Sequence, residues 1–410
     1  MTDETVVLAN GRLPDGSVVD ITVVDGMLTA VDQHDPSLLG AAQHDLDGWL
    51  VLPAPAEPHA HLDKALSAEL VPNPRGDLIG AIEAWGAASA AGAITYDGIV
   101  ERAKQAMELL LVHGVTAVRT HVNVLASTRS EPVRALREAA AEFSDVMDIQ
   151  IVGLCGFPMT GAEGAPTRAA LAESLEVGLD LVGGCPHLDP DGVGLIDLAI
   201  DAAVDAGIPI DLHVDEMLDP TMLTLRDLAR RVRDRGFDGL VAASHCVTLG
   251  MQTPETQAEV AAEVAAAGIA VFPLPQTNLF LQGRDDPTAT PRGLTAVSAL
   301  QEAGVLVAAG GDNVQDPFNL VGRSDALETA ALMVMAGHQL PEVAYDMVSG
   351  NVRQAMGLPR AGTEVGDVAD LLAIDAPSIR GAIADAPMSR RVFHRGRLVA
   401  SADQQLRVHR

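Results

Sequence analysis

The sequence predicts an α/β protein in which a (β/α)8 TIM barrel, residues 57–357, is joined to a small β-sandwich domain built from both ends of the chain, residues 1–56 and 358–410. Three observations lead to this prediction. Short apolar segments alternate with Ala-rich helical stretches, turn-rich strands occur at both ends, and no Gly-x-Gly-x-x-Gly follows a strand to bind a nucleotide. A doubly wound open sheet is the alternative that this pattern leaves open.

The terminal β-segments consist of short apolar strands separated by glycine turns. Asn10-Gly11 separates residues 5–8 from residues 18–24, and Asp25-Gly26 follows the second of these segments. Asn-Gly and Asp-Gly between alternating apolar residues are typical of β-hairpins. The other end of the chain has the same pattern, with strands expected at residues 371–374, 391–394 and 398–399. Because either segment alone would leave an exposed edge, we expect the two ends to form one domain.

The barrel strands are expected where a short apolar run is followed by helix-like sequence. They are placed at residues 50–52, which lead into His59, and at 117–121, 149–154, 179–183, 208–214, 240–244, 270–273 and 306–310. In such a barrel the loops that follow the strands form one rim, and catalytic groups lie on that rim. Polar residues at the ends of these strands are therefore the candidates for a site.

The composition limits the possible classes of function. With 410 residues, of which 48% are hydrophobic, the chain can bury a large core. A formal net charge of -29 argues against nucleic-acid and membrane partners, because binding to phosphates requires clustered Lys and Arg. Three scattered cysteines suit neither a disulfide framework nor a Cys-x-x-Cys zinc site, and the first residues show no signal-peptide pattern. We therefore expect a cytoplasmic protein that acts on a small molecule.

Histidines and an aspartate follow several of the expected strands. They are His59 and His61 after the first, His121 after the second, His213 after the fifth, His245 after the sixth and Asp312 after the eighth. Taken singly, His213 could be a core residue and Asp312 could be a helix cap. Taken together, three imidazoles and one carboxylate at a barrel rim match the ligands of Zn²⁺ or Fe²⁺, with a position left for water.

Longer motifs contain these residues. They are Glu57-Pro58-His59-Ala60-His61-Leu62-Asp63, Arg119-Thr120-His121-Val122, Gly183-Gly184-Cys185-Pro186-His187, Leu212-His213-Val214-Asp215-Glu216, Ala243-Ser244-His245 and Gly311-Asp312-Asn313-Val314-Gln315-Asp316-Pro317-Phe318. In order and spacing they resemble the amidohydrolase superfamily, and within it the cytosine deaminase-like branch. The resemblance covers most of the barrel, and it implies a metal-dependent hydrolase of C–N bonds that forms a homo-oligomer.

The resemblance also implies roles for individual residues. One divalent ion, Zn or Fe, would be bound by His59, His61, His213 and Asp312. Glu216 and His245 would handle protons. Two-metal members of the superfamily bridge their ions with a lysine or glutamate on the third or fourth strand, and residues 149–156 and 179–186 contain neither. A single metal is therefore expected.

These roles predict a hydrolytic mechanism. The metal lowers the pKa of a water from about 15.7 to near 7, and the resulting hydroxide attacks the carbon of an exocyclic C–N bond in a small nitrogen heterocycle. The departing nitrogen must be protonated, and Glu216 is the expected proton shuttle. His245 would orient and deprotonate the water, and Asp312 would accept a proton as well as bind the metal. The alternative role for Glu216 is a structural charge at a helix N-terminus.

The sequence departs from cytosine deaminases at the expected pocket. Phe157-Pro158-Met159 stands where those enzymes resemble Phe-Pro-Gln, and a thioether cannot replace an amide as donor and acceptor, so cytosine itself is not expected. A lysine at the position of Lys64 also occurs in relatives that release alkylamines from triazines, such as N-isopropylammelide amidohydrolases, which suggests that it contacts the substrate. The alternative is that Lys64 is a solvated surface residue. The expected contacts of the substrate are Lys64, Met159, Gln282, Asn313 and Phe318.

Two other functions stay open at this point. The same site could release an alkylamine, or it could open a cyclic amide or imide. A non-catalytic barrel paralogue is disfavoured, because the chain retains all four expected ligands and both proton-handling residues.

Overall fold

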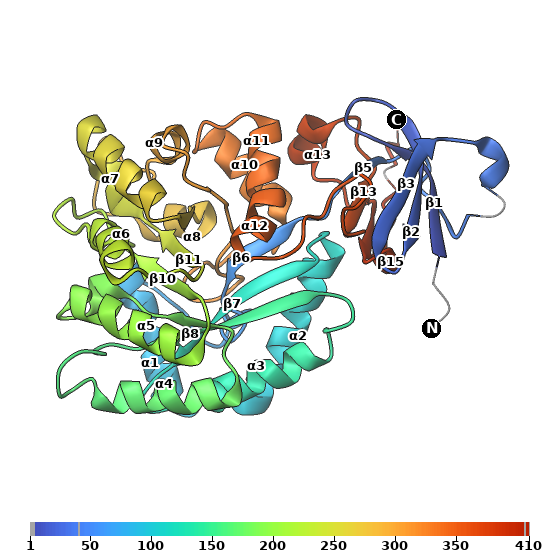
Figure 1. Cartoon of the computed structure of the whole chain (residues 1–410). Coiled ribbons are helices and arrows are strands. Elements are labelled where there is room, and N and C mark those ends of the chain that lie inside the picture. Colours follow the sequence, from blue (N-terminus) through green and yellow to red (C-terminus); the bar gives the residue numbers. More distant parts are fainter. Residues whose placement is uncertain (1–4, 40–41, 406, 410) are drawn as a thin grey trace.

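The computed structural model describes residues 5–39, 42–405 and 407–409, and it contains two sheets (Figure 1). One is a ring of parallel strands surrounded by helices, and the other is a mixed sheet formed by the two ends of the chain. The predicted barrel and the predicted β-structure from both termini are confirmed. The residue boundaries of the two domains, 1–56 with 358–410 and 57–357, stay a prediction. Within the described ranges no helix is long and apolar enough to cross a membrane.

Seven parallel strands form the barrel sheet, in the order β12-β11-β10-β9-β8-β7-β6. They are β6 (Ala56–Ala60), β7 (Ala117–Val124), β8 (Asp148–Cys155), β9 (Leu181–Gly183), β10 (Ile210–Val214), β11 (Val241–His245) and β12 (Ile269–Phe272). Helices cover the outside of the ring (Figure 1), and apolar side chains are buried both between strands and helices and on the inner side of the ring. This burial on both faces explains why the strands appear in the sequence as short, nearly continuous apolar runs.

The eighth strand, expected at residues 306–310, is not a regular strand in the described part of the chain. Isolated parallel bridges stand in its place, from Val271 to Val307 and from Ala60 to Asp312. The Glu57 side chain lies against this segment, and a Cβ atom at Gly310 would come within 2.3 Å of its Oε1. The backbone then turns at Asp312, whose φ is 67°. The barrel is therefore closed by a few hydrogen bonds and by Glu57.

The first barrel strand also differs from the prediction. Residues 50–52 lie in β5 (Leu50–Pro53), which belongs to the terminal sheet and pairs with its strand β13 (Leu371–Ile374). Pro53 and Pro55 flank the point where the chain passes to β6, and proline cannot donate a ladder hydrogen bond. The strand that leads to His59 is therefore β6, whose first residue pairs with Ala117.

Helices connect the strands of both sheets. They are α1 (Leu78–Ala90), α2 (Tyr96–Val112), α3 (Glu131–Ala141), α4 (Ala165–Val177), α5 (Gly192–Ala206), α6 (Thr224–Arg235), α7 (Pro254–Ala266), α8 (Pro275–Leu281), α9 (Val297–Glu302), α10 (Ala326–Met335), α11 (Pro341–Met347), α12 (Gly350–Ala355) and α13 (Ile379–Asp385), with short 3-10 helices η1 (Pro36–Leu38), η2 (Pro186–Leu188) and η3 (Val247–Met251). Gly178, Gly207 and Gly236 end α4, α5 and α6 with φ values of 112°, 67° and 60°. Glycine adopts this left-handed conformation without steric cost, so these residues stop the helices.

The terminal sheet has eight strands and joins both ends of the chain. Its strands are β1 (Thr5–Arg12), β2 (Val18–Val24), β3 (Met27–Gln33), β4 (His44–Asp45), β5, β13, β14 (Arg390–His394) and β15 (Arg397–Ala402). The order is β15-β14-β13-β5-β1-β2-β3, with β4 beside β1. Leu8 and Ile21 from one half share a core with Leu371 and Phe393 from the other. The expected sandwich is thus one hydrogen-bonded sheet whose two halves pack around a common core.

A buried ion-pair network ties the terminal sheet to the barrel. Asp370, which precedes β13, lies 2.9 Å from Nη1 of Arg353 in α12 and 3.2 Å from Nδ1 of His394 in β14. Its other oxygen accepts a hydrogen bond from the backbone N–H of Arg395 at 2.8 Å. Arg353 also approaches Asp148, the first residue of β8. Burial alone would raise the pKa of Asp370, but His394, Arg353 and the N–H of Arg395 together lower it.

We expect Asp370→Asn to lower the free energy of unfolding at neutral pH by about 3–5 kcal/mol, because it leaves a buried guanidinium without its partner. The pKa of Asp370 is lower in the folded protein than in the unfolded chain, so its stabilisation is present above about pH 4 and is lost as the pH falls further. Denaturant titrations from pH 3 to 7 measure both effects. The control is Asp385→Asn at an exposed position of α13, and equal losses in both variants would contradict the prediction.

Candidate active site

The predicted polar residues gather at the rim formed by the carboxyl ends of the barrel strands. His59 lies in β6 and His61 one residue beyond its end, while His213 and His245 lie in β10 and β11. Asp312 follows the irregular eighth segment, and its backbone N–H donates to the carbonyl of His59 at 3.0 Å. All five side chains are buried. Parallel strands place their carboxyl ends on one side, so residues far apart in the sequence meet there.

Four of these side chains converge on one point. The Nε2 atom of His213 lies 3.1 Å from Nε2 of His59 and 3.2 Å from Nε2 of His61. Oδ1 of Asp312 lies 3.3 Å from Nε2 of His61 and 3.8 Å from Nε2 of His59. Ligands bonded to one ion at about 2.0–2.1 Å are separated by about 2.9–3.4 Å when the angle between them is about 90–110°. The spacing of the three nitrogens therefore fits a single Zn²⁺-sized ion.

The electrostatics of this cluster also favour a cation. Burial lowers the pKa of each of His59, His61 and His213 well below the usual value, so the imidazoles are neutral and offer lone pairs. Burial raises the pKa of Asp312 to about 6, and among the described residues neither of its carboxylate oxygens has a hydrogen-bond partner. Buried polar atoms normally have partners. Three neutral imidazoles and an unpartnered carboxylate facing one point suit a divalent metal.

Glu216 and His245 lie beside the cluster. Oε1 of Glu216 is 3.6 Å from Nδ1 of His245, and that nitrogen is also 3.1 Å from Oδ1 of Asn278. Burial, and secondarily the charge of Asp312, raises the pKa of Glu216 well above its usual value. Burial lowers the pKa of His245 to about 4. The site thus pairs a carboxyl group whose pKa is raised with an imidazole whose pKa is lowered.

Asp215, whose role the sequence did not reveal, shapes the turn that presents Glu216. Its φ is 51°, so the chain reverses direction directly after β10. Its carboxylate accepts hydrogen bonds from the backbone N–H groups of Thr224 and Leu225 at 2.9 and 3.0 Å, at the start of α6. The predicted Gln282 donates to the carbonyl of Glu216 at 3.1 Å. These contacts hold the backbone of Glu216 from both sides.

A cavity of about 390 Å³ opens above the cluster. Its lining includes His61, His213, Glu216, His245 and Asp312, together with the predicted contacts Lys64, Asn313 and Phe318. Met159 and Gln282, both within the described ranges, are not lining residues. Met159 is buried in the main core, and Phe157, two residues earlier, faces the cavity instead.

Other lining residues form the apolar walls and one polar corner. Trp85 and Ile82 come from α1, and Leu125 follows β7. Lys64 is buried at the corner, with Nζ 2.9 Å from Oδ1 of Asn123 and 3.2 Å from Nδ1 of His61. Asn123 stands two residues after His121 on β7, so it shares a strand face with that histidine. That spacing was the signal in the sequence that could have identified it.

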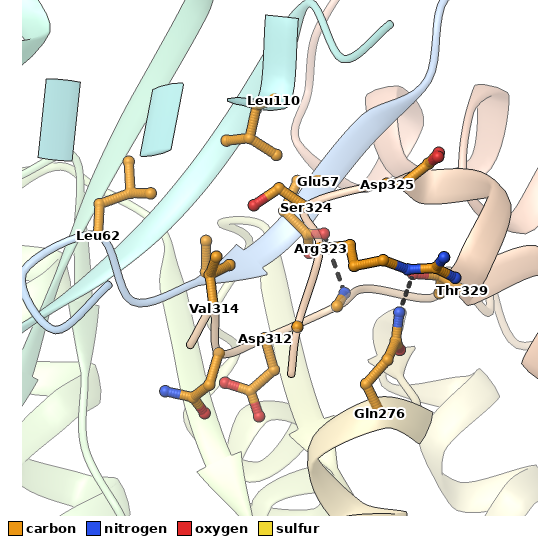
Figure 2. A pocket seen from close by; sticks show the side chains of 14 residues that line it. Glu57, Leu62, Leu110, Gln276, Asp312, Val314, Arg323, Ser324, Asp325 and Thr329 are labelled. Atoms are coloured by element: carbon orange, nitrogen blue, oxygen red, sulfur yellow. Dashed lines mark hydrogen bonds between the residues drawn. The ribbon is translucent and has the colours of Figure 1, made fainter. Parts of the chain in front are cut away.

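Glu57 forms hydrogen bonds with both of the backbone segments that contain His59 and Asp312. Figure 2 shows its carboxylate reaching the backbone beside Asp312. One oxygen accepts from the N–H of Gly311 at 2.9 Å and the other from the N–H of His59 at 3.1 Å. Burial raises the pKa of Glu57 to about 8. This side chain therefore sets the spacing between the first and last barrel segments.

Comparison with known proteins identifies related sequences. The amidohydrolase family matches residues 96–400. A pterin deaminase of Rhizobium rhizogenes (strain K84) is 31% identical over 402 residues, covering 96% of this chain and 91% of the relative. An N-isopropylammelide isopropyl amidohydrolase of Pseudomonas sp. (strain ADP) is 25% identical over 423 residues, covering 97% of each chain.

A solved structure shows the same overall arrangement. The crystal structure of 5-methylcytosine deaminase from Klebsiella pneumoniae, liganded with 5-fluorocytosine, aligns with a TM-score of 0.88 at 28% identity, covering 98% of this chain and 99% of that one. The family match and the relatives extend over most of the sequence. This chain therefore belongs to the amidohydrolase family and is a hydrolase that acts on carbon–nitrogen bonds.

Proposed function

We propose that this protein is an aminohydrolase with one metal ion that removes an exocyclic amino group from a small nitrogen heterocycle and releases ammonia. One observation carries the proposal. The Glu216 and His245 pair lies directly beside the group of three histidines and one aspartate, and all of these side chains except that of His59 line one cavity. Such a pair can move protons to and from a substrate nitrogen.

His59, His61, His213 and Asp312 would hold the ion, which we propose to be Zn²⁺ or Fe²⁺. Members of the amidohydrolase family depend on metal, and this donor set of imidazoles and a carboxylate suits either ion. When bound, the ion lowers the pKa of a water from about 15.7 to near 7 and so supplies hydroxide at neutral pH.

The proposed proton transfers follow from the environment of each group. Burial raises the pKa of Glu216, which favours its protonated form, and Glu216 would donate this proton to a ring nitrogen of the substrate. It would then take up the proton of the hydroxyl group added to the ring carbon and pass it to the amine as the C–N bond breaks, so that ammonia leaves. Expulsion of an unprotonated amide anion is prohibitive, so this transfer is essential. Neutral His245 would accept a proton from the attacking water, with Asn278 fixing the orientation of its ring. Asp312 would serve as a second acceptor.

The shape and lining of the cavity favour a planar aromatic substrate. Trp85, Ile82, Leu125 and Phe318 provide apolar walls, and about 390 Å³ accommodates one or two fused rings. Relatives are named for pterin and for 5-methylcytosine, both of which carry an amino group on a ring. Pterin-like and pyrimidine amines are therefore the first substrates to test. The sequence-based argument against cytosine depended on Met159, which does not line the cavity, so cytosine belongs in the same panel.

A second candidate reaction is the release of an alkylamine. It is favoured by the relative named for N-isopropylammelide and by Lys64, which faces the cavity beside His61. Opening of a cyclic amide or imide would use the same groups. A non-catalytic paralogue stays the least favoured alternative, because all six of the predicted metal-binding and proton-handling side chains meet at one site.

The remaining expectations concern the setting of the protein. Three unpaired cysteines suit a reducing cytoplasm, and the net charge of -29 disfavours nucleic-acid and membrane partners. We also expect a homo-oligomer, on the resemblance to the family alone.

Removal of a ligand tests the metal site. We expect His213→Ala to lose stoichiometric metal while it stays folded, because the two remaining imidazoles and Asp312 cannot complete the donor set. Metal content by mass spectrometry of the purified protein, alongside circular dichroism, measures this. His409→Ala, at an exposed position, is the control. Full metal content in His213→Ala would remove His213 from the ligand set.

The proton path is tested at Glu216. We expect Glu216→Gln to keep the metal and to lose about 10²–10⁴-fold in kcat, because an amide cannot shuttle a proton. Steady-state kinetics on the best substrate, with metal analysis of the same sample, provide the measurement. Glu342→Gln, on the surface in α11, is the matched control. Near-normal turnover would exclude Glu216 from the path.

The bond that breaks is tested with a substrate panel. We expect ammonia, rather than an alkylamine, from at least one amine among pterins, cytosine, methylated pyrimidines, creatinine and triazines. Ammonia is measured by a coupled assay and alkylamine by mass spectrometry on the same reactions. Alkylamine as the sole product would favour the second candidate, and no product from any member by the metal-loaded protein would favour the paralogue.

A further inference from the structure

A buried chain of polar groups lies behind His59, on the side away from the other ligands. Nδ1 of His59 is 2.7 Å from Oγ of Ser244, and that hydroxyl donates to Oδ1 of Asp211 at 3.2 Å. Nη1 of Arg119 donates to the other carboxylate oxygen of Asp211 at 2.8 Å. Each of these side chains is at most 1% exposed. Water therefore cannot substitute for any link of the chain.

We propose that Ser244 and Asp211 are positioning residues that hold the His59 ring in the tautomer whose Nε2 is unprotonated and faces the other three ligands. The inference rests on the proposed metal site, and it adds two residues that do not touch the ion. A metal-binding histidine commonly donates its other ring N–H to a carboxylate, which fixes its tautomer and orientation. Here a serine hydroxyl would link the two groups.

The direction of the hydrogen bonds follows from the two ends of the chain. A carboxylate only accepts hydrogen bonds, so the Ser244 hydroxyl must direct its proton to Asp211. A lone pair of Oγ then accepts a hydrogen bond from the Nδ1–H group of His59. With Nδ1 protonated, a neutral imidazole has its lone pair on Nε2, 3.1 Å from Nε2 of His213.

Arg119 is the partner of the acceptor end of the chain, with its Nη1 2.8 Å from Oδ2 of Asp211. Nε of Arg119 donates to Oε1 of Gln150 at 3.0 Å, and Nη2 donates to the carbonyl of Ala355 at 3.3 Å. The guanidinium is thus held in place on several sides. Burying this ion pair is expensive, which argues that it serves more than packing.

The strands place these groups one layer below the ligands. Asp211 stands two residues before His213 on β10, so both side chains point into the barrel. Arg119 has the same relation to His121 on β7. Ser244 lies on β11 directly opposite His213 in the parallel register. Branched aliphatic residues dominate the interior layers of such barrels, and here a polar network takes their place.

Two further contacts hold His59 in place, one at its ring and one at its backbone. The His121 ring stacks on it with the centroids 3.9 Å apart, and Glu57 accepts its backbone N–H. His59, His121 and Asp211 also have donor atoms close enough to suggest a second metal site. The Ser244 hydroxyl already occupies Nδ1 of His59, and Arg119 neutralises Asp211, so a hydrogen-bonded support explains this cluster better than an ion.

The test measures binding of Zn²⁺ alone to the metal-free full-length protein, by competition with a chromophoric chelator. We expect Ser244→Ala to weaken Zn²⁺ binding about 10–100-fold, and Ser244→Thr, which keeps the hydroxyl, to restore most of it. Ser174→Ala is the matched control, because Ser174 in α4 is equally buried and its hydroxyl has no hydrogen-bond partner among the described residues. Thermal unfolding of the metal-free proteins shows whether the substitutions affect the fold.

The outcomes separate this inference from the proposed function. Wild-type affinity in Ser244→Ala, with metal lost in His213→Ala, would overturn the positioning role and leave the metal site intact. Failure of the wild-type protein to bind Zn²⁺ or Fe²⁺ would overturn both. If Ser244→Ala does not fold, Asp211→Asn replaces it, since the amide keeps the size of the side chain. A weakened affinity that Ser244→Thr restores supports the inference.

Discussion

The burial of neutral imidazoles around a carboxylate is the constraint on which the rest of the site depends. His59, His61 and His213 bring their Nε2 atoms to within 3.1–3.2 Å, and Asp312 adds an oxygen that has no hydrogen-bond partner among the described residues. These separations match those between ligands of one ion, and a cation between the nitrogens would accept the lone pairs that the rings direct toward it. Burial keeps the rings neutral, so these lone pairs stay available to an ion. The cluster is therefore best explained as a site shaped for a metal ion.

Closure of the barrel serves the same cluster. On the observed backbone, a Cβ atom at position 310 would lie 2.3 Å from the Glu57 carboxylate, so glycine is required there. Glu57 binds the N–H groups of His59 and Gly311, on the two segments that carry ligands. The irregular closure thus places the carboxylate of Asp312 across from the histidines of β6 and β10. The backbone turns at Asp312 with a positive φ, as it does at Asp215 after β10, and both turns direct polar side chains to the site.

Much of the architecture could be predicted from local sequence. Buried parallel strands appear as short apolar runs, and glycines such as Gly207 end the helices between them, so both can be recognised without tertiary information. Two strand assignments were wrong for a tertiary reason. Residues 50–52 are apolar enough for either sheet, and only their pairing with β13 assigns them to the terminal one. Residues 306–310 are a strand-like run that pairs with the β12 segment through an isolated bridge and a few hydrogen bonds instead of a regular ladder.

The sequence by itself determined the kind of chemistry, because histidines and an aspartate at the ends of successive apolar strands are brought together by any closed parallel barrel. It could not determine which neighbours support or face the site. Lys64 could equally have been a surface residue, yet it is buried against Asn123 and His61. Met159 could have faced the cavity, yet it lies in the core. Ser244, Asp211 and Arg119 lie on three different strands, and their contact depends on strand register and side-chain packing, which only the tertiary structure decides.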